Sequence, residues 1–207
     1  VTEGLQALYT FEEGSGTTVH DVAGIEEPLD LSADDPVAIR WVEGGLSVVE
    51  STVIVSHQAA DRIVEAVRSS NALTVEAWVA PANTLQDGPA RIITLSLNSS
   101  SRNFTLGQGL WGSQPSDVYD MRLRTSTTDG NGFPSLTTGA GTLAADLSHI
   151  VYTRDVNGLA AIYLDGMLMA EAVVGGDLSN WDTSYPLALA NELTGDRPWL
   201  GTFYLVA

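Results

Sequence analysis

Two dipeptides that favour tight turns, Asn157-Gly158 and Asp165-Gly166, lie close together within the stretch from Ser148 to Ala170. Asn, Asp and Gly tolerate the positive φ that both central positions of a type I′ turn require, and alternating apolar residues flank each dipeptide. The pattern predicts two consecutive β-hairpins, and therefore three antiparallel strands in a row. Because the strand between the turns is apolar on both alternating phases, we expect other layers of structure to cover both of its faces.

Short apolar segments separated by Gly, Pro, Asn and Asp recur along most of the chain. Strands spaced in this way, without intervening helices, are typical of a β-sandwich or a β-barrel. The predicted strands cover residues 5–9, 37–42, 46–49, 73–80, 91–97, 103–107, 118–124, 150–154, 159–164, 168–174, 187–190 and 200–206.

One segment, residues 58–68, departs from the strand pattern. Its apolar residues recur at helical spacing, and charged residues such as Asp61 and Glu65 lie on the opposite side. We expect a short amphipathic helix with Ser56 as its N-cap, because the hydroxyl can accept a hydrogen bond from the first turn. Such a helix either covers the core or binds a partner, and we favour the first role.

The chain is strongly acidic: 26 acidic residues face nine basic ones, all of them Arg, and the net charge is −17. A field of this sign repels nucleic acids and anionic lipids, so neither is an expected partner. No apolar run reaches the roughly 18 residues of a membrane span, so membrane insertion is not expected. The lack of Cys excludes disulfides and Cys-based zinc sites. At 207 residues, the chain fits a single all-β domain over 1–207.

Four segments carry a resemblance to a known family. They are residues 4–24 (GLQALYTFEEGSGTTVHDVAG), residues 73–79 (LTVEAWV), the stretch 149–166 with HIVYTR and YLDG, and residues 187–201 (LALANELTGDRPWLG). In this order they resemble the laminin G-like, concanavalin A-like lectin/glucanase jelly roll nearly from end to end. The resemblance implies an all-β fold, a two-sheet antiparallel jelly-roll sandwich with the one short helix near residues 58–68.

The closing segment departs from that family. Many relatives carry an Asp soon after the Gly and continue for several residues, whereas this chain ends with GTFYLVA over 201–207. We therefore expect a domain that is truncated in its closing strand. The resemblance also implies a structural calcium ion near Glu12 and Asp21, since Ca²⁺ prefers oxygen ligands. The missing Asp weakens that expectation, and the favoured interpretation of Asp21 is that it caps its turn through an Asx hydrogen bond. No cofactor is expected to be required.

Aromatic side chains in loops are the first candidates for a ligand site, because sugar rings stack on exposed aromatic faces. Trp78 lies in the middle of a predicted strand and is expected in the core, as is Trp41. Trp111 and Trp181 lie in loops rich in Gly or Asp, where a large aromatic is harder to explain. We predict that these two contact a ligand; the alternative is that each anchors its loop on the sandwich.

A polar row adds to this candidate site. Arg122 and Arg124 alternate on one predicted strand and therefore share a face, and Asp129 and Asn131 follow in the next turn. Such a row can bind sugar hydroxyls or an acidic polysaccharide, or it can neutralise nearby carboxylates. In the loop that contains Asn191, Glu192, Asp196 and Arg197, an internal ion-pair network is the favoured interpretation.

Catalytic motifs are missing from the sequence. Glucanases of this fold present Glu-x-Asp-x-x-Glu on one strand, whereas the acidic pairs at 12–13 and 26–27 are adjacent and point to opposite faces. The three His residues show no spacing of a zinc site. The chain is thus predicted not to be an enzyme.

The sequence predicts a non-catalytic recognition module, carbohydrate-binding or adhesive, in a secreted or cell-surface protein. A polysaccharide or the glycan of a glycoprotein is then the expected partner. The alternative is a structural or protein-interaction module that binds a protein partner or self-assembles through its sheet edges. A polysaccharide hydrolase or lyase is the third and least favoured hypothesis.

Overall fold

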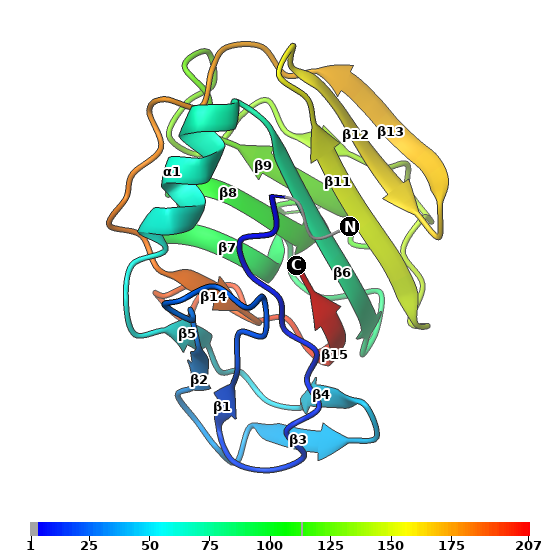
Figure 1. Ribbon diagram of the computed structural model, residues 1–207. Helices are drawn as coiled ribbons and strands as arrows, with labels where there is room; N and C mark the ends of the chain where they lie inside the picture. Colours follow the sequence, from blue (N-terminus) through cyan, green and yellow to red (C-terminus); the bar gives the residue numbers. More distant parts are fainter. Residues whose placement is uncertain (1–3, 113) are drawn as a thin grey trace.

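The computed structural model describes residues 4–112 and 114–207, which form two antiparallel sheets packed face to face with one helix at the side (Figure 1). In spatial order, the eight-stranded sheet consists of β1 (Thr18–Val19), β2 (Leu31–Ala33), β5 (Ile54–Ser56), β14 (Leu187–Leu189), β7 (Ala90–Asn98), β8 (Ser101–Gln108), β9 (Tyr119–Leu123) and β10 (Leu136–Thr137). The seven-stranded sheet consists of β13 (Met167–Val173), β12 (Leu159–Leu164), β11 (Ser148–Arg154), β6 (Leu73–Pro81), β15 (Gly201–Val206), β4 (Gly45–Val48) and β3 (Ile39–Val42).

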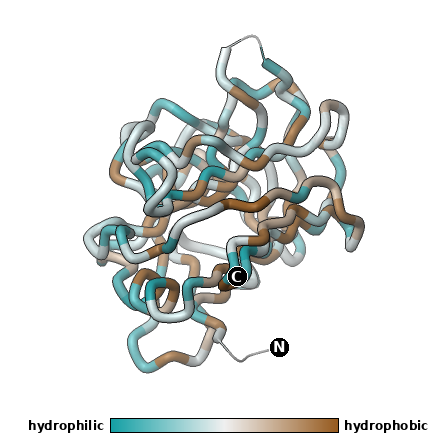
Figure 2. The backbone as a smooth tube through the Cα atoms, turned by 90° about the horizontal axis from the view of Figure 1, so that it is seen from above, coloured by the Kyte–Doolittle hydropathy of each residue, from teal (hydrophilic) through white to brown (hydrophobic). Residues whose placement is uncertain are grey.

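One hydrophobic core lies between the inner faces of the two sheets. Apolar side chains alternate with polar ones along the central strands, as on β6, where Leu73, Val75, Ala77 and Val79 are buried. Hydrophilic and hydrophobic stretches are interspersed along the whole backbone in Figure 2. The predicted two-sheet antiparallel sandwich is therefore confirmed.

Helix α1 (Asp61–Ser70) covers one side of the sandwich and buries Ile63, Val64 and Val67. The predicted helix is confirmed with its bounds shifted, but the predicted cap is wrong. Ala60 occupies the N-cap position and provides no side-chain hydrogen bond. The hydroxyl of Ser56 instead donates to the carbonyl of Gln58 and accepts from the backbone N–H of Leu187, so it joins β5 to β14. Within the described residues, no helix is long and apolar enough to cross a membrane.

The three strands β11, β12 and β13 are present and antiparallel, as predicted. The turn at Asp165 and Gly166 has positive φ at both residues, 51° and 79°, as a type I′ turn requires. The other predicted type I′ turn is wrong. There the Gly158 N–H bonds to the Asp155 carbonyl, and only Gly158 has positive φ. The Asp155 carboxylate accepts hydrogen bonds from the N–H groups of residues 157 and 159. The turn therefore spans residues 155–158, one residue earlier than predicted.

The prediction that other layers cover both faces of the strand between the two turns holds only for the middle of that strand. Ala160, Ala161 and Ile162 of β12 are buried, whereas Leu159 at its start is exposed. Strand β13 beyond it is exposed at every position except Ala170. The seven-stranded sheet therefore ends in an open apolar edge.

The strand predictions fail at the start of the chain and at the shortest strands. Residues 5–9 form no strand, and Tyr9 makes a single bridge to Val206. The short strands β1, β2, β5 and β10 escape prediction because two or three residues are too few to show a period of two. Strand β15 lies between β6 and β4, and Ala207 exchanges two backbone hydrogen bonds with Glu76. Truncation of the closing strand stays a prediction.

The two turn glycines offer a matched test of this geometry. Gly166→Ala places a side chain at positive φ in open space and is expected to cost about 1–2 kcal/mol of unfolding free energy. Gly158→Ala is expected to cost more, because its Cβ would also lie 2.7 Å from the carbonyl oxygen of Val174. Urea denaturation of both variants measures the difference, and equal losses would contradict the assigned turn.

Candidate functional site

A layer of polar side chains covers the outer face of strands β7, β8 and β9. On these strands, core residues such as Ile93, Leu106 and Met121 alternate with polar residues that point away from the core. Together with one loop carboxylate, they form what we call the outer polar layer. Its members are at most 5% exposed: Arg91, Thr94, Ser96, Arg102, Thr105, Asp120, Arg122 and Glu192.

Arg91 and Glu192 form a fully buried ion pair at one end of this layer. The Arg91 Nε lies 3.0 Å from Glu192 Oε2, and its Nη1 donates to the carbonyl of Pro89. Burial lowers the pKa of Arg91, while Glu192 opposes this effect. The other oxygen of Glu192 accepts a hydrogen bond from Ser96. This pair therefore ties the loop after β14 to strand β7.

A second ion pair joins Arg122 to Asp120, two residues apart on β9. The Arg122 Nε lies 3.0 Å from Asp120 Oδ2, and Asp120 Oδ1 accepts the hydroxyl hydrogen of Thr137 at 2.6 Å. The ring of Phe133 covers the Arg122 guanidinium at 4.4 Å and is itself exposed. Phe133 therefore forms part of the rim of the layer.

Arg102 is the exception in the layer, because no carboxylate of the described residues pairs with it. Its Nη1 donates to Thr105, and its Nη2 donates to the Ser99 carbonyl and to Asn131 Oδ1. Its Nε is buried without an acceptor in the described structure. Burial, and after it the charges of Arg91 and Arg122, lower the pKa of the Arg102 guanidinium to about 9. The site thus holds a poorly compensated buried cation.

The loop after β9 positions Asn131 between two arginines. Its Oδ1 accepts from Arg102 Nη2 at 2.6 Å and from Arg122 Nη1 at 3.3 Å. Asp129 shapes this loop, because its carboxylate accepts the backbone N–H groups of Asn131 and Phe133. The structure therefore brings together three predicted residues, Arg122, Asp129 and Asn131.

Arg124, the fourth predicted polar residue, is not part of this cluster. It follows the last residue of β9, and its backbone bonds to Asn103 and Trp181. Its charge acts on Asp182 instead, where it helps to lower the pKa of that carboxylate. Arg122 and Arg124 therefore do not share a strand face, because β9 ends at Leu123.

The two predicted tryptophans have opposite environments. Trp111 is 65% exposed and stacks on the guanidinium of Arg197 at 4.5 Å, which itself pairs with Asp196. Trp181 is fully buried, its ring lies against Phe104, and its Nε1 donates to the Arg124 carbonyl. The prediction that Trp181 contacts a ligand is therefore wrong, since its loop folds back into the core.

The two tryptophans that were expected in the core are also differently placed. Trp78 is 38% exposed on the outer face of the seven-stranded sheet, where it stacks on His149 at 4.5 Å. His149 in turn bonds to the carboxylate of Glu76. Trp41 is half-buried, and its Nε1 donates to the carbonyl of Gly16. An apolar strand does not by itself say which face an aromatic residue occupies.

The carboxylate of Asp21, a predicted calcium ligand, already accepts hydrogen bonds from other groups of the protein. Its carboxylate accepts the N–H groups of Leu8, Ala23 and Leu29, and it pairs with the Arg62 guanidinium. Burial alone would raise the pKa of Asp21, but these hydrogen bonds hold it below its usual value. A calcium ion would have to displace Arg62, so the carboxylate is better described as the cap of its turn.

Glu12, the other predicted ligand, is exposed. Across residues 4–112 and 114–207, no group of three or more His, Cys, Asp or Glu side chains could hold a metal ion.

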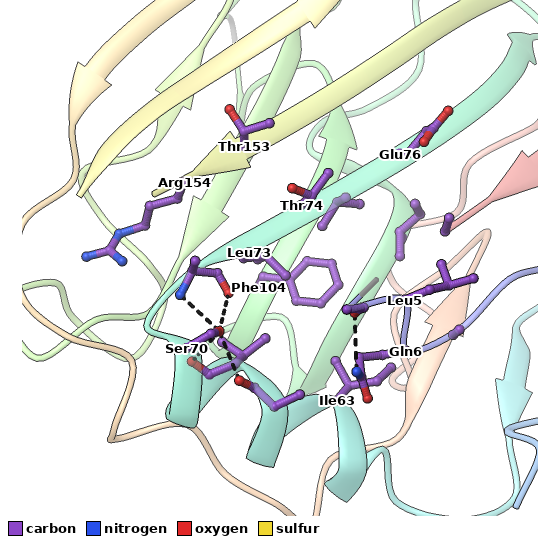
Figure 3. Close-up of a pocket in the computed structure, with 18 of the residues that line it drawn as sticks. Leu5, Gln6, Ile63, Ser70, Leu73, Thr74, Glu76, Phe104, Thr153 and Arg154 are labelled. Carbon is purple, nitrogen blue, oxygen red and sulfur yellow. Dashed lines mark hydrogen bonds between the residues drawn. The ribbon is translucent and has the colours of Figure 1, made fainter. Parts of the chain in front are cut away.

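A cavity of about 730 Å³ lies between α1 and β6 (Figure 3). Its wall is mainly apolar and includes Leu5, Ile63, Leu73 and Phe104, while Arg154 points away from it. The cavity opens toward the core side of the eight-stranded sheet and is separate from the outer polar layer. Polar residues also line it, and they include Gln6, Thr74, Glu76, Thr153 and Glu171.

The comparisons with known proteins agree with this fold. Residues 56–207 match the concanavalin A-like lectin/glucanases superfamily, and the chain belongs to that family. The resemblance seen in the sequence is confirmed. None of the curated proteins matches the chain.

Several solved structures share the fold at low sequence identity. Domain 4 of a GH43 extracellular arabinanase from Geobacillus stearothermophilus, in complex with arabinotriose, is 16% identical with a TM-score of 0.64, and the match covers 98% of this chain and 90% of that one. A Trypanosoma rangeli sialidase is 16% identical with a TM-score of 0.61, over 97% of this chain and 29% of the sialidase. Botulinum neurotoxin type C, described as depending on two ganglioside molecules for cell entry, is 14% identical with a TM-score of 0.61, over 100% and 48%.

The different burial of Trp181 and Trp111 predicts different losses of stability when each is replaced. Trp181→Ala is expected to lower the free energy of unfolding by about 3–5 kcal/mol, because it removes a fully buried ring from the core. Trp111→Ala is expected to cost no more than about 1 kcal/mol, the usual contribution of an exposed cation–π contact. Chemical denaturation followed by tyrosine fluorescence compares the two variants, and the reverse order of losses would contradict their placement.

Proposed function

We propose that this domain is a non-catalytic module that binds a glycan across the outer polar layer. The observation that carries the proposal is the pair of exposed aromatic rings at its rim, Trp111 on Arg197 and Phe133 on Arg122. Each ring has one face held by a guanidinium, which orients it. Sugar recognition needs such rings together with nearby hydrogen-bonding groups.

The layer between the rings supplies those groups. An unbroken path of hydrogen bonds runs from Arg91 through Glu192, Ser96, Thr94, Thr105, Arg102 and Asn131 to Arg122 and Asp120. Side chains that are already held in place lose little entropy when a ligand binds. The network lies beneath the surface and holds the accessible groups at its edge, Asn131 and Phe133, in fixed positions for recognition.

The carboxylates of the layer favour binding over catalysis. A glycosidase needs one carboxyl group that stays protonated and a second one that is ionised. Asp120 and Glu192 each pair with an arginine and each accept a hydrogen bond from a hydroxyl group, so both serve as acceptors within the layer. This arrangement gives neither group the role of a general acid.

The similar structures also support glycan binding as the proposed function. The arabinanase domain was solved in complex with arabinotriose, and cell entry of the neurotoxin depends on interaction with two ganglioside molecules. The arabinanase is an extracellular enzyme, and the neurotoxin enters cells. A secreted or cell-surface location for this chain is part of our proposal.

A glycan array followed by calorimetry on the best ligand tests the proposed function. Trp111→Ala is expected to weaken binding by about tenfold, because an aromatic stacking contact contributes about 1.4 kcal/mol. Trp78→Ala, which removes an exposed tryptophan from the opposite sheet, is the matched control and is expected to bind normally. Loss of binding in the control alone, or binding to no glycan on the array, would contradict the proposal.

A second candidate function is favoured by one observation, the open edge at β13. Met167, Leu168 and Val173 are more than half exposed along this edge strand of the seven-stranded sheet. Exposed apolar edges are templates for pairing with another strand, so the module would assemble with a second copy of itself. Concentration-dependent assembly that Leu168→Lys abolishes, without any glycan binding, would favour this function instead.

A further inference from the structure

The outer polar layer lacks one negative charge. It contains three guanidinium groups, of Arg91, Arg102 and Arg122, and two carboxylates, of Asp120 and Glu192, so its formal charge is +1. Two of the arginines have carboxylate partners, and Arg102 is the one without. A buried charge without a counter-charge is costly, and proteins rarely keep one without a function.

The other buried arginine of the sandwich shows what a purely structural role looks like. Arg154 is 2% exposed, and each of its three nitrogens donates to a backbone carbonyl, with Val174, Asn71 and Gly176 among the acceptors. Arg102 by contrast keeps a buried Nε without an acceptor, as does the Nη2 of Arg91. Unused donors on two neighbouring arginines point to a missing acceptor.

Asn131 marks the accessible position at which a negatively charged group would contact two of these arginines. Its amide oxygen lies within hydrogen-bond distance of both Arg102 and Arg122, where one oxygen of an anion could sit. A carboxylate oxygen in its place would form charge-assisted hydrogen bonds, which are about twice as strong as neutral ones. Asn131 is only half-buried, and its loop contains Gly130 and Gly132, so this is the accessible side of the cluster.

We propose that the layer recognises an acidic saccharide, whose carboxylate displaces the Asn131 amide and binds between Arg102 and Arg122. This inference rests on the proposed glycan-binding function and names its ligand class. The net charge of −17 works against an acidic ligand at long range. At physiological salt, however, charges beyond about 8 Å are largely screened, and direct contacts with the arginines dominate.

Two substitutions test the charge deficit without any ligand. Asn131→Asp places a permanent carboxylate between Arg102 and Arg122, and we expect it to raise the thermal midpoint by about 2–4 °C. Arg102→Met removes the uncompensated charge and is expected to keep or raise the midpoint, whereas Arg154→Met is expected to lower it. A lower midpoint for Asn131→Asp would overturn the proposal, because the site would then have no need for an anion.

Binding is tested with oligogalacturonate and with its methyl ester, which keeps the sugar and removes the charge. We expect the charged form to bind at least about tenfold more tightly, and Arg102→Met and Asn131→Asp each to weaken it by about 10- to 100-fold. Trp78→Ala again serves as the control. Sodium sulfate alone, tested by its effect on the thermal midpoint, shows whether a free anion suffices.

The outcomes separate this inference from the proposed function. Equal binding of both forms, or neutral glycans alone on the array, would overturn the acidic ligand and leave glycan recognition standing. Stabilisation by sulfate without binding of any glycan would support the anion site but contradict the saccharide as its occupant. Binding of neither oligogalacturonate nor sulfate would overturn the inference entirely.

Discussion

The eight-stranded sheet is buried on both faces at its centre, and the rest of the site depends on this constraint. The inner face packs into the core, so it is apolar. The outer face is polar yet withdrawn from water, and its groups must therefore satisfy one another. The ion pairs Arg91–Glu192 and Arg122–Asp120 do so, and a path of hydrogen bonds connects them through Ser96, Thr94, Thr105, Arg102 and Asn131. The rim loops with Trp111 and Phe133 are held in place by the arginines beneath them.

The effect of a buried polar layer on stability depends on whether its hydrogen bonds are complete. A fully satisfied network rigidifies a surface, whereas one with unused donors costs stability. Here Arg102 has no carboxylate partner, and both Arg102 and Arg91 keep a buried donor without an acceptor, which is why we assign the layer to ligand recognition rather than to folding alone. The family contributes the sandwich, and an arabinanase domain of the same fold was solved in complex with arabinotriose. The chemistry of the ligand follows from the arginines of this chain.

Much of the fold could be predicted from the sequence, and about half of the site. Period-two alternation and turn dipeptides locate the long strands, because both are local signals. Trp181 and Trp78 were misplaced, since the face that an aromatic side chain occupies depends on the path of loops and on register. The sequence did not lead us to predict Arg91 and Arg102 as site residues. On the same strands, however, polar residues alternate with apolar ones at Thr94, Ser96 and Thr105. That repeated alternation on neighbouring strands was the signal for a second, polar layer.

The central claim is that an anion belongs between Arg102 and Arg122. The most direct test is a crystal grown in sodium selenate, measured at the selenium absorption edge to locate the anion by anomalous scattering. Our account predicts an anomalous peak within hydrogen-bond distance of both guanidinium groups, with the Asn131 side chain displaced. A site that stays empty while selenate occupies exposed arginines such as Arg40 would contradict it.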